Sequence, residues 1–256
     1  MEGTQKFQQK FILLVVVVVM MASGAFLLSP VAGIGQPSVS FANHTLMGAS
    51  FTVPNLTFPQ EDATHIRSGF DDCKCRATCF TLGSKCQAWS FIEGEGIDSE
   101  CRIIDKGPET TNLINMTDAT YFFKESSVGG HYTWAPDHLL YVELERLHNF
   151  QDAKEQCAKI PGHRMIIAHA DDTLNFFIQY KSLYGYSIFW ADLIKIGYQK
   201  ARWADGTIVV PQLGRVDMSG TNENHFAAFD GLGIHDVPDD SHYRVLCQAN
   251  PLGVEW

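Results

Sequence analysis

The sequence predicts an α+β fold built as two halves that disulfide bonds hold together. Two cysteines at helical spacing and then several short apolar runs mark the first half. The second half follows a pattern of strand, helix, helix, and then strands with long loops. The seven cysteines divide in the same way, with five in the first half and two in the second. A chain of 256 residues is long enough for two small domains.

Residues 1–35 have the features of a targeting segment and take no part in the predicted fold. Lys6 and Lys10 precede the unbroken apolar run of residues 11–21, and Ser23 and Ala25 are small residues suited to a signal-peptidase site. The apolar stretch also approaches the length of a membrane-spanning helix. Two interpretations therefore stay open: a cleaved signal peptide of a secreted protein, or an uncleaved anchor of a type II membrane protein with its C-terminal part outside the cell. Residues 36–49 show no clear period, and we expect a leader there.

Three glycosylation sequons agree with an exported chain, and they begin at Asn43, Asn55 and Asn115. The formal net charge is −10, and the sequence has no cluster of Lys and Arg. A basic face that would bind nucleic acid is therefore excluded. Electrostatic docking on anionic lipid is not indicated either, so a membrane is a partner only if the N-terminal segment is left uncleaved.

Residues 50–125 form the first predicted domain. Residues 71–82 predict a helix with Cys75 and Cys79 on one face, because side chains four positions apart are neighbours on a helix. The apolar runs 87–92, 101–104 and 121–124 predict strands. A zinc site is disfavoured because Cys73 and Cys75 lack the CxxC-type spacing of structural zinc ligands. In an exported chain these cysteines instead indicate disulfide bonds.

Residues 75–79, 86–91 and 101–104 resemble a PAN/apple domain. The resemblance implies an antiparallel sheet that cradles a helix, with disulfides Cys75–Cys101 and Cys79–Cys86. It also implies a module that binds proteins or sugars and has no catalytic residues of its own. Cys73 has no partner in this scheme. An odd cysteine in an exported protein points to a bridge between two chains, which would give a disulfide-linked dimer, or to a spare thiol.

The small, polar residues 126–130 predict a linker to the second domain, residues 131–250, which a tail of residues 251–256 follows. Residues 138–145 alternate like a half-buried strand, and 149–158 have helical spacing up to Pro161 and Gly162. A short strand at 165–168 precedes a helix that Asp171 is placed to cap. Residues 189–193 and 201–206 predict strands, with a tight turn at Asp205 and Gly206.

The second half resembles a C-type lectin-like domain, with at least five landmarks in the family's order. These are the helix 149–157, the strand and helix between 165 and 177, the core strand 189–193, the Trp-x-Asp-Gly turn 203–206 and the final strand 243–247. The resemblance implies two helices, antiparallel sheets and a long loop region. It also implies a disulfide between Cys157 and Cys247.

The calcium loop of the family's sugar-binding members is absent from this sequence. No Glu-Pro-Asn or Gln-Pro-Asp triplet occurs between Trp203 and Asn224, and the Trp-Asn-Asp position carries residues 234–236. Of the implied metal ligands only Asp236 remains, and one carboxylate does not hold calcium. The family's inner disulfide is also missing, since Phe226 and Asp239 stand near the expected cysteine positions.

The acidic stretch 235–242 permits two interpretations. It is either a divergent ligand or cation site or a solvated turn, and the candidate binding residues are Glu223, His235, Asp236, Asp239 and Asp240. The sequence contains no Gly-x-Ser-x-Gly elbow, His-Glu-x-x-His helix or glycine-rich phosphate loop, so we expect no enzyme activity. We expect an extracellular protein that binds a glycan or a protein without a cofactor. The alternatives are a calcium-dependent lectin and a disulfide-linked structural protein.

Overall fold

The computed structural model describes residues 38–254 except for 45–47, 95–97, 169–172, 174, 178, 181–187, 198–199, 210–215, 218–224, 230–232 and 239. The described residues form a mixed structure of helices and sheets, as the sequence predicts. The expected targeting segment 1–35 lies outside them. No helix among the described residues is both long and apolar enough to cross a membrane.

Within the described residues, six strands form an antiparallel sheet in the first half, in the order β1-β2-β6-β4-β5-β3. Their bounds are β1 Ser40–His44, β2 Gly48–Thr57, β3 His65–Ser68, β4 Ala88–Ile92, β5 Glu100–Ile104 and β6 Ile114–Lys124. Short 3₁₀ helices lie between them, η1 Gln60–Asp62, η2 Gly83–Lys85 and η4 Pro108–Thr110, and η5 Glu125–Ser127 follows β6. The three strands expected at 87–92, 101–104 and 121–124 are β4, β5 and the end of β6.

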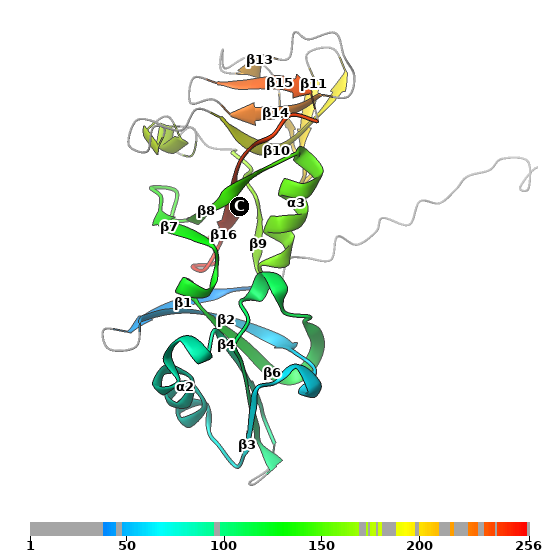
Figure 1. Ribbon diagram of the computed structural model, residues 1–256. Coiled ribbons are helices and arrows are strands. Elements are labelled where there is room, and N and C mark those ends of the chain that lie inside the picture. Colours follow the sequence, from blue (N-terminus) through cyan, green and yellow to red (C-terminus); the bar gives the residue numbers. More distant parts are fainter. Residues whose placement is uncertain are drawn as a thin grey trace, which may run out of the picture. The chain divides into compact units, whose positions relative to one another are not determined.

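Helix α2, Asp72–Thr81, packs against one face of this sheet (Figure 1). Asp71 caps it, since its carboxylate accepts a hydrogen bond from the Lys74 backbone N–H at 2.7 Å. Disulfides Cys75–Cys101 and Cys79–Cys86 join the helix to β5 and to the residue that follows η2. These are the two pairs that the resemblance implies. Between helix and sheet, the rings of Trp89 and Phe122 stack with centroids 5.0 Å apart.

The expected leader, residues 36–49, contributes instead to the sheet. It contains β1 and the start of β2, which pair in antiparallel register from Ser40↔Thr52 to His44↔Gly48. Phe41 packs on Phe51 with ring centroids 5.0 Å apart, and Val39 is buried. A strand this short gives no readable alternation, because its burial depends on partners that come later in the chain.

A second sheet contains ten strands of the described residues, with the main order β13-β15-β14-β10-β16-β8-β7. Strands β11 and β12 extend it from β10, and β9 pairs with β16. The bounds are β7 Gly130–Trp134, β8 Leu140–His148, β9 His163–Met165, β10 Phe189–Gly197, β11 Lys200–Trp203, β12 Ile208–Val209, β13 Val216–Asp217, β14 His225–Phe229, β15 Ile234–Pro238 and β16 Tyr243–Ala249. The expected strand 165–168 is thus limited to its first residue, in β9.

Helix α3, Phe150–Lys159, begins after Asn149, whose side-chain oxygen accepts a hydrogen bond from the Asp152 N–H at 2.8 Å. Its buried face consists of Phe150, Ala153 and Cys157, which recur at helical spacing. Cys157 is bonded to Cys247 in β16, the pair implied by the lectin-like resemblance. For the second expected helix, the described residues between Thr173 and Tyr180 are helical. Its proposed cap, Asp171, lies outside the described residues.

The two halves share one hydrophobic cluster. Phe51 of the first sheet lies with its ring centroid 4.9 Å from that of Tyr132 in β7 and 5.5 Å from that of His163 in β9. The expected linker, residues 126–130, runs from the end of β6 to the start of β7, and its Val128 is buried in the same cluster. The connection between the two sheets is therefore packed against both of them.

Candidate functional site

Two of the five candidate binding residues lie in β15 and a third lies just after it. His235 and Asp236 belong to the strand, and Asp240 is exposed in the following turn. Glu223 and Asp239 lie outside the described residues. Strand β15 pairs with β14 on one side and with β13 on the other. His235 and Asp236 are both half-buried, in contrast to Asp240.

Asp236 forms an ion pair with Lys195 of β10. The Lys195 Nζ donates a hydrogen bond of 2.8 Å to the Asp236 Oδ2, and the two side chains are 5% and 9% exposed. Strand β14 lies between β10 and β15 in the sheet, so the pair spans a strand. The paired carboxylate offsets part of the cost of burying the Lys195 ammonium at this depth.

The ion pair changes what Asp236 can bind. An ammonium group 2.8 Å from the carboxylate already supplies the positive charge that a cation would bring. A divalent ion at the same oxygen would have to displace Lys195 or bear its repulsion. Within the described part of the chain, no three His, Cys, Asp or Glu side chains are grouped so as to hold a metal. The structure therefore gives Asp236 a different partner from the calcium ion considered from the sequence.

The predicted Trp-x-Asp-Gly turn joins β11 to β12 next to a buried carboxylate. The Gly206 N–H donates to the Trp203 carbonyl at 2.9 Å, and Gly206 adopts φ 95°, which favours glycine. The Ala204 N–H donates to the carbonyl of Asp192 in β10. The Asp192 side chain is buried and accepts a hydrogen bond from Lys154 Nζ at 3.1 Å. Burial raises the pKa of Asp192, and Lys154 opposes this rise.

His163 is a buried polar residue at the start of β9. Its Nδ1 lies 3.0 Å from the Pro161 carbonyl, which can only accept, so this nitrogen carries the proton. Its Nε2 then accepts from the Tyr132 hydroxyl at 3.0 Å. Burial lowers the pKa of His163 to about 4, so the ring is neutral at pH 7. No sequence signal marks it, because its partners come from distant segments.

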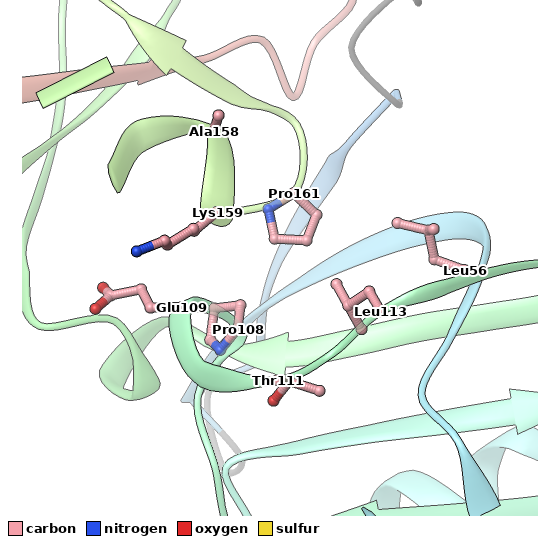
Figure 2. Close-up of a pocket in the computed structure, with 8 residues that line it drawn as sticks. All are labelled: Leu56, Pro108, Glu109, Thr111, Leu113, Ala158, Lys159 and Pro161. Carbon is pink, nitrogen blue, oxygen red and sulfur yellow. The ribbon is translucent and has the colours of Figure 1, made fainter. Parts of the chain in front are cut away.

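A pocket of about 240 Å³ lies between η4 and the end of α3. Its lining consists of Leu56, Pro108, Glu109, Thr111, Leu113, Ala158, Lys159 and Pro161. Figure 2 shows Lys159 and Glu109 at one side of this pocket and Leu56 and Leu113 at the other. The pocket is thus apolar over most of its wall and charged at one end. His235, Asp236 and Asp240, the binding candidates that the structure describes, do not line it.

The described geometry brings together few of the residues that the sequence singles out. Of that set, His235 and Asp236 are neighbours in β15, while Lys195 lies in the part of β10 that extends beyond the predicted strand 189–193. A paired lysine could not have been chosen from the sequence, since Lys195 and Asp236 are 41 positions apart. The sequence offered only one indication, that Asp236 stands alone of the metal ligands implied by the lectin-like resemblance.

No protein family model matches the sequence, and no curated protein sequence does either. Among solved structures, the C-type lectin TC14 from the tunicate Polyandrocarpa misakiensis is 13% identical and covers 43% of this chain and 96% of its own, with a TM-score of 0.39. The C-type lectin CEL-I from Cucumaria echinata is 16% identical and covers 46% and 93%, with a TM-score of 0.37. Human lithostathine is 14% identical and covers 47% and 88%, with a TM-score of 0.36. At these TM-scores the similarities establish neither the family nor the function of this chain.

Proposed function

We propose that this chain is an exported, non-catalytic recognition protein whose lectin-like second half binds a glycan or a protein ligand without calcium. In this proposal the first half is a PAN/apple-like module. The support comes from the chain's own residues. Asn149 caps the first helix of the second half, Cys157 and Cys247 bridge that helix to β16, and the Trp-x-Asp-Gly turn closes the β11–β12 hairpin.

The Lys195–Asp236 ion pair carries the calcium-independent part of the proposal. Asp236 is the one acidic residue that matches the lectin-like pattern of metal ligands. Its carboxylate is held at 2.8 Å by an ammonium from the same chain. A ligand at this end of the second half would therefore be bound by hydrogen bonds and apolar contacts, with no ion shared between protein and ligand.

Calcium titration tests this reading directly. We expect millimolar calcium to leave the thermal unfolding midpoint of the full chain at its value in chelator. This should hold separately for the wild type and for Asp236→Asn, whose own midpoints can differ. A calcium-induced rise in the midpoint that Asp236→Asn abolishes would establish the alternative, a calcium-dependent lectin with a non-standard loop. Glu223→Gln and Asp239→Asn extend the same comparison to the remaining acidic candidates.

A glycan array separates the two ligand classes. The array is probed with the full chain in calcium and again in chelator. Binding that persists in chelator assigns a glycan ligand and supports the proposal. Binding lost in chelator contradicts its calcium-independent part. If no glycan is bound in either condition, the protein ligand becomes the reading to pursue.

Cys73 favours a second candidate, a disulfide-linked interaction protein. Its thiol is exposed in the first turn of α2, while the two neighbouring cysteines of this helix are bridged. In this reading, two copies join through Cys73. We expect a dimer band on a non-reducing gel that disappears with reductant and in Cys73→Ser. A monomer under oxidising conditions would remove the reason for this candidate.

A further inference from the structure

We propose that the pocket between η4 and α3 is the seat of the protein's own N-linked glycan, attached at Asn115. The inference rests on the proposed export of the chain, because only an exported chain is glycosylated at sequons. It concerns a surface away from β15, and it does not depend on which ligand the second half binds. The occupant is the first sugar of the glycan, an N-acetylglucosamine.

Strand pairing brings Asn115 to the pocket. Strands β2 and β6 are antiparallel, and their register places Leu56 opposite Asn115. Side chains of opposed residues project from the same face of a sheet. Leu56 lines the pocket, so Asn115 projects from the pocket's face of the sheet. Leu113, two positions before Asn115, lines the pocket as well.

The exposure of the sequon residues is compatible with modification. Asn115 and Thr117 are both exposed, although Leu56 and Leu113 beside them are half-buried. The sequon residue Asn55 is also exposed nearby, at an irregularity in the β2–β6 register and with φ 60°. Asn43 is exposed in β1, which lies on the other side of β2 from β6. Asn115 is the sequon residue whose opposed partner lines the pocket.

The chemistry of the pocket suits a sugar. An N-acetylglucosamine has an apolar ring face and an acetamide methyl, which would pack on Leu56, Leu113 and Pro161. Its hydroxyl groups would face the charged end, where Glu109 and Lys159 lie (Figure 2). The volume of about 240 Å³ is below the ~300–1,000 Å³ of drug-sized sites. A single small unit fits it better than a long ligand.

Site-resolved glycan release tests the proposal. The full chain is produced in a eukaryotic secretory host and treated, while folded, with an amidase that removes N-linked glycans, and mass spectrometry follows each sequon. We expect release at Asn115 to be about tenfold slower than at Asn43, the ratio that ~1.4 kcal/mol of packing would give. Leu113→Ser should bring the Asn115 rate close to that of Asn43. Ile114→Ala, which changes an adjacent exposed residue outside the pocket and creates no new sequon, should leave it slow.

Three outcomes overturn the inference. Equal release rates at Asn43 and Asn115 would show that the sugar is not seated, and so would protection that survives Leu113→Ser. An unmodified Asn115 in a secreted, glycosylated chain would also overturn it while leaving the calcium-independent binding proposal intact. If Leu113→Ser does not fold, Thr117→Ala removes the glycan and leaves Asn115 in place. It should lower the melting temperature by ~2–4 °C, whereas Asn43→Gln should not.

Discussion

Lys195 and Asp236 show how strongly the free-energy cost of burying one charged side chain depends on its partner. Two buried charges lose most of their hydration, and their attraction offsets this cost only while both are present. Each side chain is less than a tenth exposed. Loss of one charge therefore leaves the other buried without its ion-pair partner, which costs more than loss of both.

Removing only the lysine should be costly. Lys195→Met leaves the Asp236 carboxylate buried beside an apolar group, which should lower the free energy of unfolding by ~3–5 kcal/mol. The double variant Lys195→Met/Asp236→Val removes both charges and should recover part of this loss. Chemical denaturation of the wild type, the two single variants and the double variant closes the cycle. A double variant less stable than Lys195→Met would contradict the reasoning.

His163 makes stability depend on pH. Its pKa is about 4 in the folded protein, below the ordinary value of 6.5. The folded state therefore binds this proton less readily than the unfolded state. The contribution of His163 to the stability is complete above pH 6.5, and it is lost as the pH falls from 6.5 to about 4. The full loss is ~3 kcal/mol, at about 1.4 kcal/mol for each unit of pKa difference.

His163→Gln isolates this effect. A glutamine amide can donate to the Pro161 carbonyl, and its oxygen can accept from Tyr132, but it does not titrate. We expect unfolding free energies measured in urea between pH 7 and pH 4 to decrease less steeply in the variant. Asp192 and Glu143, whose pKa values burial raises, act in the opposite direction in both proteins. The same slope in wild type and variant would exclude His163 as the cause.

The residues that the sequence could assign are those whose role is local or follows a spaced motif. Asn149 caps a helix three residues from its partner, and Gly206 closes a turn. The role of Lys195 could not be assigned, because a charged residue in a strand is ordinarily placed in solvent. The burial of His163 has no local sequence signal either. Its burial results from rings contributed by both sheets.

At the scale of elements, the disulfides differ in the length of chain that they close. Cys157–Cys247 spans 90 residues and Cys79–Cys86 spans seven. In the chain-entropy model, the longer loop restricts the unfolded state more. The short bridge fixes the turn after α2, while the long one ties α3 to β16 near the middle of the second sheet.

We expect replacement of the long bridge by two serines to destabilise the protein more than the same replacement of the short bridge. Replacing Cys157 and Cys247 should reduce the free energy of unfolding by ~4–5 kcal/mol, and replacing Cys79 and Cys86 by ~2–3 kcal/mol. Denaturant unfolding of the two double variants, each compared with the wild type, measures both values. A larger loss from the short bridge would show that local packing around α2 outweighs chain entropy.

For helices and strands with a row of buried side chains, the sequence predicted the bounds to within a few residues. Both α2 and α3 begin one residue after the side chain that caps them, and β4 and β5 coincide with apolar runs. Strand β1 was not predictable, because five residues with no alternation carry no period. Its place depends on β2, with which it pairs, and on the ring of Trp134, which packs on Phe41.

At the scale of the whole described chain, the packing joins the two halves. Phe51 is fully buried, stacks on Phe123 within its own sheet, and contacts Tyr132 and His163 of the second. A sequence divided at residues 126–130 suggests two independent modules. The shared cluster indicates that their stabilities are coupled, because neither half can expose this surface without cost.

This coupling predicts one unfolding transition. Hydrogen exchange followed by mass spectrometry should give the same midpoint for peptides from β5 and from β16 in increasing denaturant. Phe51→Ala removes the ring that both halves contact and should separate the two midpoints. Phe80→Ala, in α2 where the ring packs on Trp89 of the first sheet, serves as the control and should keep them together. Separate midpoints in the wild type would contradict the coupling.

The Cys157–Cys247 disulfide also imposes a delay during biosynthesis, because its second cysteine is made long after its first. Cys247 is made 90 residues after Cys157, which at ~5–20 residues per second is a delay of ~5–20 s. The cysteines of the first half are complete before that interval starts, and Cys73 stays exposed and unbridged. Throughout the delay, the nascent Cys157 has Cys73 as a competing thiol. The yield of correctly oxidised protein therefore depends on disulfide reshuffling, and Cys73→Ser should raise that yield when isomerase is scarce.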